Sequence, residues 1–145
     1  MERKKFLKSL GAGAAFALIF PCVQGCSSGG DEEVIDAKPV PTGVDFTIDL
    51  NSSEASNLKN NGGFILKNLV VVVRNLEGAF VAASQVCSHQ GTENVRFVND
   101  NGGIFNCSTH GARFDQTGAP LNSITSKPLK IFKTELNGDI LRVFE

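Results

Sequence analysis

Two short motifs contain both histidines of the chain and two of its four cysteines. The first reads C-S-H-Q-G over residues 87–91, and the second reads C-S-T-H-G over residues 107–111. Cysteine thiolate and histidine imidazole are common protein ligands for zinc and iron. The two motifs therefore predict a metal site whose ligands are Cys87, His89, Cys107 and His110.

Three kinds of site are open on the residue types alone. Two ordinary loops could hold buried cysteines and neutral histidines, but that does not explain why these side chains gather in two spaced pairs. A Cys₂His₂ zinc site has suitable ligands, although zinc sites usually pair Cys with Cys and His with His. The third is a [2Fe–2S] cluster with two cysteines on one iron and two histidines on the other.

Short strands are expected to position both motifs. Residues 80–84 and 104–105 read as strands that lead into the first and the second motif. Residues 44–50 alternate between apolar and polar, which indicates a half-buried strand, and the apolar run 69–73 indicates a strand buried on both faces. Further strands are expected at 64–66, 130–136 and 140–144, the last two joined by a turn at Asn137-Gly138, with one helical turn within 53–58.

Length and composition fit one all-β domain. The chain has 145 residues and a mass of 15.5 kDa, and its 41% of hydrophobic residues is enough for a core. The 15 glycines suggest many tight turns, and the 11 phenylalanines must supply the aromatic core because Trp and Tyr are absent from the sequence. With 14 basic and 15 acidic residues, the charge gives no reason to expect a nucleic-acid partner.

The N-terminus has the pattern of an export signal. A basic head at 3–8 precedes an apolar run at 10–20 that is too short to span a membrane, which predicts a signal peptide over residues 1–25 rather than a buried helix. Residues 26–43 begin with small and charged residues and are expected to form a flexible tether. Without residues 1–25 the chain has 10 basic and 14 acidic residues, a net charge of −4.

Two resemblances refine this interpretation. The residues V-Q-G-C at 23–26 resemble a bacterial lipobox, which implies a lipid on Cys26 and an exported lipoprotein in the periplasm or cell-envelope membrane of a bacterium. The residues R-K-K-F-L-K at 3–8 resemble the twin-arginine export motif, with Lys4 in place of the second arginine.

The paired motifs and their surroundings resemble the Rieske iron–sulfur family. Besides the ligand pattern, the resemblance rests on A-A-S-Q-V at 82–86, H-G-A-R-F-D at 110–115 with Gly118, and K-P-L at 127–129. It covers about residues 44–145 and implies a Rieske-like antiparallel β-sandwich with a small cluster-binding part at about 86–115. Its [2Fe–2S] cluster would have two thiolates on the buried iron, Cys87 and Cys107, and two imidazoles on the outer iron, His89 and His110.

The departures from the family pattern concern the second motif and its partner loop. Rieske subunits of cytochrome bc complexes carry a disulfide between the two loops, and here Thr92 and Thr109 stand at or beside those positions. Those subunits also carry a serine and a tyrosine whose hydroxyls bond cluster sulfur, where this chain has Ala112 and Phe114. The resemblance then implies a potential in the lower half of the Rieske range of about −150 to +300 mV.

The resemblance implies one-electron transfer with a redox partner protein, as a carrier or as a subunit of a larger oxidoreductase. The small Rieske subunit of a periplasmic molybdenum oxidase, similar to arsenite oxidase, and the ferredoxin of an oxygenase system are the alternatives. A Rieske oxygenase needs a further iron held by two more histidines and a carboxylate, and this chain has no third histidine. We therefore do not expect the chain to be an enzyme by itself.

Overall fold

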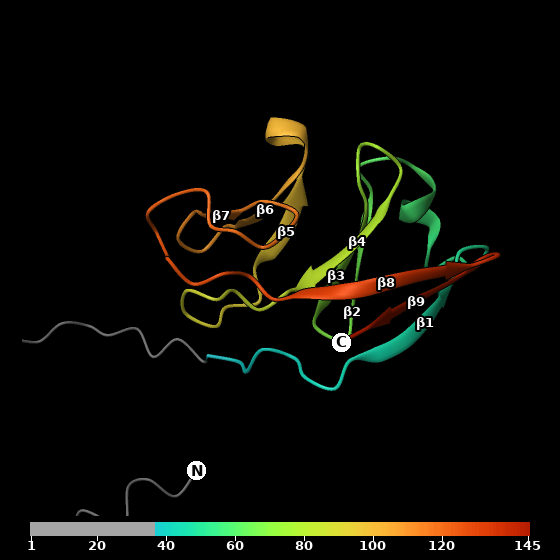
Figure 1. The fold of residues 1–145 in the computed structure, drawn as a ribbon, viewed down its shortest axis with the longest axis horizontal. Helices are drawn as coiled ribbons and strands as arrows, with labels where there is room; N and C mark the ends of the chain where they lie inside the picture. The colour runs from blue at the N-terminus through green and yellow to red at the C-terminus, as the bar shows by residue number, and fades with distance from the viewer. Residues whose placement is uncertain (1–36) are drawn as a thin grey trace, which may run out of the picture. The chain divides into compact units, whose positions relative to one another are not determined.

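The computed structural model describes residues 37–145, which form antiparallel strands and two short 3₁₀ turns (Figure 1). The elements are β1 (Asp45–Asp49), η2 (Ser56–Lys59), β2 (Phe64–Lys67), β3 (Val70–Arg74), β4 (Phe80–Ser84), β5 (Val95–Val98), η3 (Asp100–Gly102), β6 (Ile104–Cys107), β7 (Ala112–Phe114), β8 (Ile131–Asn137) and β9 (Ile140–Phe144). The expected export signal at 1–25, Cys26, and the tether as far as residue 36 lie outside the described residues.

The strands form two sheets. The larger has the order β1-β9-β8-β4-β3-β2, and the smaller has the order β5-β6-β7. Every pairing between these strands is antiparallel. The expectation of an all-β antiparallel fold is confirmed.

The small sheet is an insertion between two paired strands of the large sheet. Strands β4 and β8 pair through Ala82 with Phe132 and Ala83 with Ile131, so the chain leaves and re-enters the large sheet at one place. Figure 1 shows β5, β6 and β7 gathered beside the large sheet at this exit point. Both cysteine–histidine motifs lie in this insertion.

Strand β3 separates two hydrophobic cores. Val70 and Val72 face a core that also contains Ile48, whereas Val71 and Val73 face a second core. All four valines are fully buried, so the predicted strand with two buried faces is confirmed. The second core is made mainly by the small sheet and includes both motif cysteines, with Phe97 and Phe105 in edge-to-face contact and their ring centroids 5.7 Å apart.

Two sequence expectations differ from the structure by one residue. Leu69 was expected to begin a strand, but it lies in the tight turn between β2 and β3 with a φ of +62°. Strand β8 continues through Asn137, which pairs with Ile140, so the turn falls on residues 138–139. In both cases the register of the paired strands determines which residues form the turn. Local turn preference alone does not determine this.

Within residues 37–145, no helix has the length and apolar character that a bilayer crossing requires.

Candidate metal centre

The first motif lies in a loop that a buried serine fixes to the end of β4. The Ser84 hydroxyl donates to the carbonyl oxygen of Val86 over 2.9 Å and accepts from the Val86 N–H over 3.0 Å. The Cys87 N–H then donates to the carbonyl oxygen of Thr92, and the Gly91 N–H donates back to the carbonyl oxygen of Cys87. These bonds close a compact loop with His89 near its tip.

The second motif is the turn of the β6–β7 hairpin. Cys107 is the last residue of β6 and pairs with Ala112, the first residue of β7. The Gly111 N–H donates to the carbonyl oxygen of Cys107 over 2.9 Å, and Gly111 has a φ of +77°, a conformation that glycine adopts without strain. His110 is exposed in this turn.

The structure brings the two cysteines together inside the domain and the two histidines together nearer to solvent. Cys87 and Cys107 are 2% and 1% exposed and share a hydrogen bond between their sulfur atoms. The imidazole rings of His89 and His110 meet edge to face, with centroids 5.0 Å apart and an angle of 83°. His89 is half-buried.

The two thiols ionise at different pH values because they share a proton. The hydrogen bond from the Cys87 thiol lowers the pKa of Cys107, and burial opposes this. The same bond, together with burial, raises the pKa of Cys87. Backbone N–H groups of His89 and Gln90 also point at the Cys87 sulfur, and the N–H of Thr109 points at Cys107. The sulfur pair therefore carries one negative charge readily, on Cys107, and a bound metal ion must displace the second proton from Cys87.

A hydroxyl group lies beside the buried sulfur pair. The Thr92 hydroxyl is 3.5 Å from the Cys107 sulfur, whereas Ala112 and Phe114 are fully buried and present none. From the sequence, Thr92 was noted only because it stands at or beside the position of a disulfide cysteine in related subunits. Its contact with Cys107 was not predicted. Thr92 directly follows the first motif, but no local pattern shows that its hydroxyl meets the sulfur of a residue 15 positions away.

A segment between β7 and β8 lies across both motifs. The Ser88 hydroxyl donates to the carbonyl oxygen of Lys127 over 2.9 Å, which fastens this segment to the first loop. The Asn122 side chain donates to the carbonyl oxygen of Gly111 over 2.8 Å, which fastens it to the hairpin. This segment, which contains the K-P-L residues at 127–129, is thus held to both loops.

The chain preceding β1 also contacts the first loop. The Lys38 N–H donates to the carbonyl oxygen of Gly91 over 2.9 Å, and the Lys38 ammonium pairs with Glu93. A Cβ at Gly91 would lie 3.0 Å from the Cβ of Ala37, so the two segments pack closely. We call residues 37–38 the N-terminal strap.

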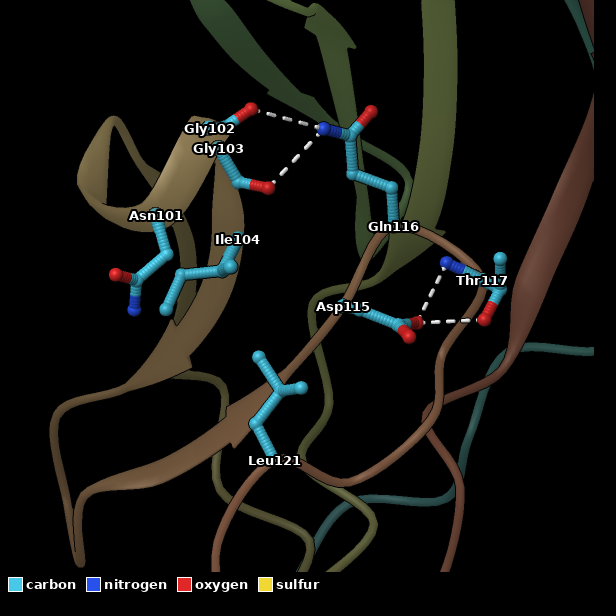
Figure 2. Close-up of a pocket in the computed structure, with 8 residues that line it drawn as sticks. All are labelled: Asn101, Gly102, Gly103, Ile104, Asp115, Gln116, Thr117 and Leu121. Carbon is cyan, nitrogen blue, oxygen red and sulfur yellow. Dashed lines mark hydrogen bonds between the residues drawn. The ribbon is translucent and has the colours of Figure 1, made fainter.

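Figure 2 shows a shallow pocket elsewhere on the small sheet. The Gln116 side chain donates to the carbonyl oxygens of Gly102 and Gly103 and accepts from the Asn75 side chain. Asp115 accepts from the N–H and hydroxyl of Thr117. These polar groups form hydrogen bonds with one another. The bonds hold the surrounding loops in place, and we assign these residues a structural role.

The family of the chain follows from this arrangement and from one comparison. The family model for the Rieske [2Fe-2S] domain matches residues 45–133, which contain both motifs and strands β1 to β7. This chain belongs to the Rieske [2Fe-2S] domain family. The Rieske domain binds a [2Fe–2S] cluster, so the general family assignment and its cofactor are confirmed.

Individual Rieske proteins match parts of the chain. The iron–sulfur subunit of the cytochrome b6-f complex of Chlorobaculum thiosulfatiphilum is 38% identical over 69 residues, which are 48% of this chain and 37% of that protein. The match thus spans little more than a third of that relative. The plasma membrane Rieske protein of Synechocystis PCC 6803 is 32% identical, with 52% of this chain and 76% of that chain covered and a TM-score of 0.45.

A ferredoxin shares the fold over most of its length. The ferredoxin of carbazole 1,9a-dioxygenase from Nocardioides aromaticivorans IC177 is 24% identical, covers 61% of this chain and 92% of its own, and superposes with a TM-score of 0.52. This likeness shows that the two proteins share a fold over 61% of this chain.

The residues present fit a Rieske cluster. Nδ1 of His89 is buried and has no hydrogen-bond partner, which is costly for a polar atom unless it binds a ligand. Both cysteines are free thiols. No three His, Cys, Asp or Glu side chains of residues 37–145 gather around one metal position. A two-iron cluster needs only two protein ligands at each iron, so the separate sulfur and nitrogen pairs suit it.

Proposed function

We propose that Cys87 and Cys107 bind one iron of the cluster, that His89 and His110 bind the other, and that the chain transfers single electrons to or from a redox partner protein. The observation that carries this proposal is the placement of two buried sulfurs behind two paired imidazoles, one of which has an unpartnered buried nitrogen. When bound, the cluster accepts and releases one electron at a time.

The chain's own residues explain how such a centre is held and reached. The N–H groups of His89, Gln90 and Thr109 offset negative charge on the sulfurs. The buried cysteines keep one side of the site away from water, while the exposed His110 leaves the other side open. Electrons therefore enter and leave through the histidine edge, where the path to a partner is shortest.

Metal and sulfide analysis tests the ligand assignment. The purified protein should contain about two iron atoms and about two acid-labile sulfides, and its reduced form should give an EPR signal. Cys107→Ser should lose both, whereas Ser108→Ala, at the exposed neighbouring position, should retain them. One zinc atom without sulfide would contradict the proposal.

We further propose that the protein is exported through residues 1–25 and anchored by lipid at Cys26. The basic head, the apolar run and the lipobox-like residues support this. Lipid labelling should mark the wild-type protein in the membrane fraction and should be lost in Cys26→Ala. Cys22→Ala is the matched control, because it removes a nearby cysteine of the same region and should keep the label. An unlabelled wild-type protein that retains residues 1–25 in the cytosol would contradict the proposal.

A further inference from the structure

Three polar side chains form a line of hydrogen bonds that leads from the surface to the Cys107 sulfur. The Asn94 side-chain amide donates to the Thr109 hydroxyl over 2.7 Å, and Thr109 donates to the Thr92 hydroxyl over 3.0 Å. The Thr92 hydroxyl lies 3.5 Å from the Cys107 sulfur. Asn94 and Thr109 are exposed and Thr92 is half-buried, so the line runs inward from solvent.

The ionisation of a metal-bound cysteine fixes the direction of the last bond. A ligand thiolate has no proton to donate, so Thr92 must be the donor and Cys107 the acceptor. Because Thr92 accepts from Thr109, and Thr109 accepts from Asn94, every proton along the line points toward the sulfur. A hydroxyl that accepts one hydrogen bond is polarised and donates its own more strongly.

We propose that Thr92, oriented by Thr109 and Asn94, raises the reduction potential of the centre by donating its hydroxyl proton to the Cys107 sulfur. This inference rests on the proposed role of Cys107 as a ligand. The reduced centre carries one more negative charge than the oxidised one, so a donated hydrogen bond stabilises the reduced form more. Thr92 is in this sense a positioning residue that acts through Cys107 without binding metal.

The other hydrogen bonds show why Thr92 is the main hydroxyl donor to the sulfur pair. The Ser88 hydroxyl is committed to the carbonyl oxygen of Lys127, and the Ser84 hydroxyl to that of Val86. Ala112 and Phe114, which share the buried core with both cysteines, have no hydroxyl. Removal of the Thr92 hydroxyl therefore leaves the backbone N–H groups and the weaker contact of the Thr109 hydroxyl as donors to the sulfur pair.

The decisive experiment compares two substitutions of Thr92 by voltammetry of the cluster-containing protein near neutral pH. Thr92→Val keeps the shape and removes the donor, and it should lower the equilibrium constant for one-electron reduction about tenfold, which equals about 59 mV. Thr92→Ser keeps the hydroxyl and should stay at the wild-type potential. Thr134→Val is the control, because it removes a hydroxyl bond to the Phe80 carbonyl oxygen, away from the cysteines, and should cost stability without shifting the potential.

Thr109→Val tests the line at an exposed position. Its potential should also fall, by less than in Thr92→Val, because the Thr92 hydroxyl stays but is no longer oriented and only the weaker contact of the Thr109 hydroxyl with Cys107 is lost. In D₂O, pulsed EPR of the reduced Thr92→Val protein should lose one of the exchangeable-deuteron couplings that the wild type and Thr92→Ser show, while the couplings of the backbone N–D groups remain.

Two results would overturn the inference while leaving the proposed function intact. One is an iron- and sulfide-replete Thr92→Val with the wild-type potential and deuteron coupling. The other is a Thr109→Val protein with the wild-type potential, which decides the matter even where Thr92→Val loses its metal. A wild-type protein without iron and sulfide would instead contradict the proposed function, and this inference with it.

Discussion

Thr109 donates a hydrogen bond to Thr92 over 3.0 Å, and this contact links the hairpin that carries Cys107 to the loop that carries Cys87. The two hydroxyls stand at or beside the positions where Rieske subunits of cytochrome bc complexes have a disulfide. The hydrogen bond between the two threonines links the same two loops as that disulfide. Unlike a disulfide, it does not depend on the redox state of the surroundings.

Replacement of both threonines by cysteine should create a covalent link. The hydroxyl oxygens are close enough that sulfur atoms in their places should oxidise to a disulfide without a large backbone shift. The double variant Thr92→Cys with Thr109→Cys should unfold with a free energy about 3 kcal/mol higher than its reduced form, because the link closes a loop of intermediate length. Urea denaturation with and without reductant measures this, and Thr92→Cys alone should show no reductant dependence.

A hydroxyl introduced on β7 should raise the reduction potential. Ala112 is directly opposite Cys107 in the register of β6 and β7 and is fully buried with it. Ala112→Ser should raise the potential by about 59 mV if its hydroxyl donates to a cluster sulfur, which is a tenfold change for one electron. Ala82→Ser buries the same hydroxyl in the other core and should leave the potential unchanged. Equal potentials in the two variants would show that position 112 does not reach sulfur.

Gly118 should be far less tolerant of substitution than Gly138, although both have a positive φ. A Cβ at Gly118 would collide with the carbonyl oxygen of Leu129, whereas a Cβ at Gly138 would meet open space. Gly138→Ala should cost about 1 kcal/mol from backbone strain, and Gly118→Ala about 3 kcal/mol from strain and overpacking together. Chemical denaturation of the two variants compares these costs. Similar losses would mean that the segment holding Leu129 moves aside freely.

The Asp115 turn should make stability depend on pH in the acid range. The Thr117 hydroxyl, together with the backbone N–H groups of Ala119, Thr117 and Gly118, holds the pKa of this carboxyl below its ordinary value. A carboxyl with a depressed folded-state pKa adds stability above its unfolded pKa and loses it as the pH falls through the folded value. Asp115→Asn should therefore be about 1 kcal/mol less stable than wild type at pH 7.

The same comparison at lower pH provides the check on the sign. The difference between wild type and Asp115→Asn, measured by urea denaturation, should shrink as the pH falls below about 4, because the wild-type carboxyl then becomes protonated. A difference that is constant from pH 7 to pH 2 would show that the charge of Asp115 contributes nothing.

The strands were predictable wherever burial imposes a local pattern. The alternation of residues 44–50 appears as β1, with Val44 and Ile48 buried and the residues between them more exposed. The valine run of β3 was predictable because a strand between two cores must be apolar on both faces. Strands β5 and β7 were not predicted, since their four and three residues are too short to show a period.

The candidate site was predictable in its residue types and not in its supporting contacts. The four proposed cysteine and histidine ligands were predictable because these rare residue types occur in two short motifs. Such motifs can be recognised from the sequence without knowledge of the fold. The contact between Thr92 and Cys107 joins residues 15 positions apart, and it depends on how the loop and the hairpin meet in space. No local sequence pattern indicates a contact of this kind, so the role of the Thr92 hydroxyl was not predicted.

Under the proposed lipid anchoring at Cys26, the N-terminal strap limits how far the proposed cluster site can move from the membrane. Lys38 is bonded to Gly91, two positions after His89, so the chain enters the domain right beside a proposed cluster ligand. The 12 residue steps from Cys26 to Lys38 span at most about 43 Å when fully extended. A domain anchored at Cys26 would therefore stay within that distance of the membrane surface. A partner would have to place its own electron-transfer site within the same distance to exchange electrons with it.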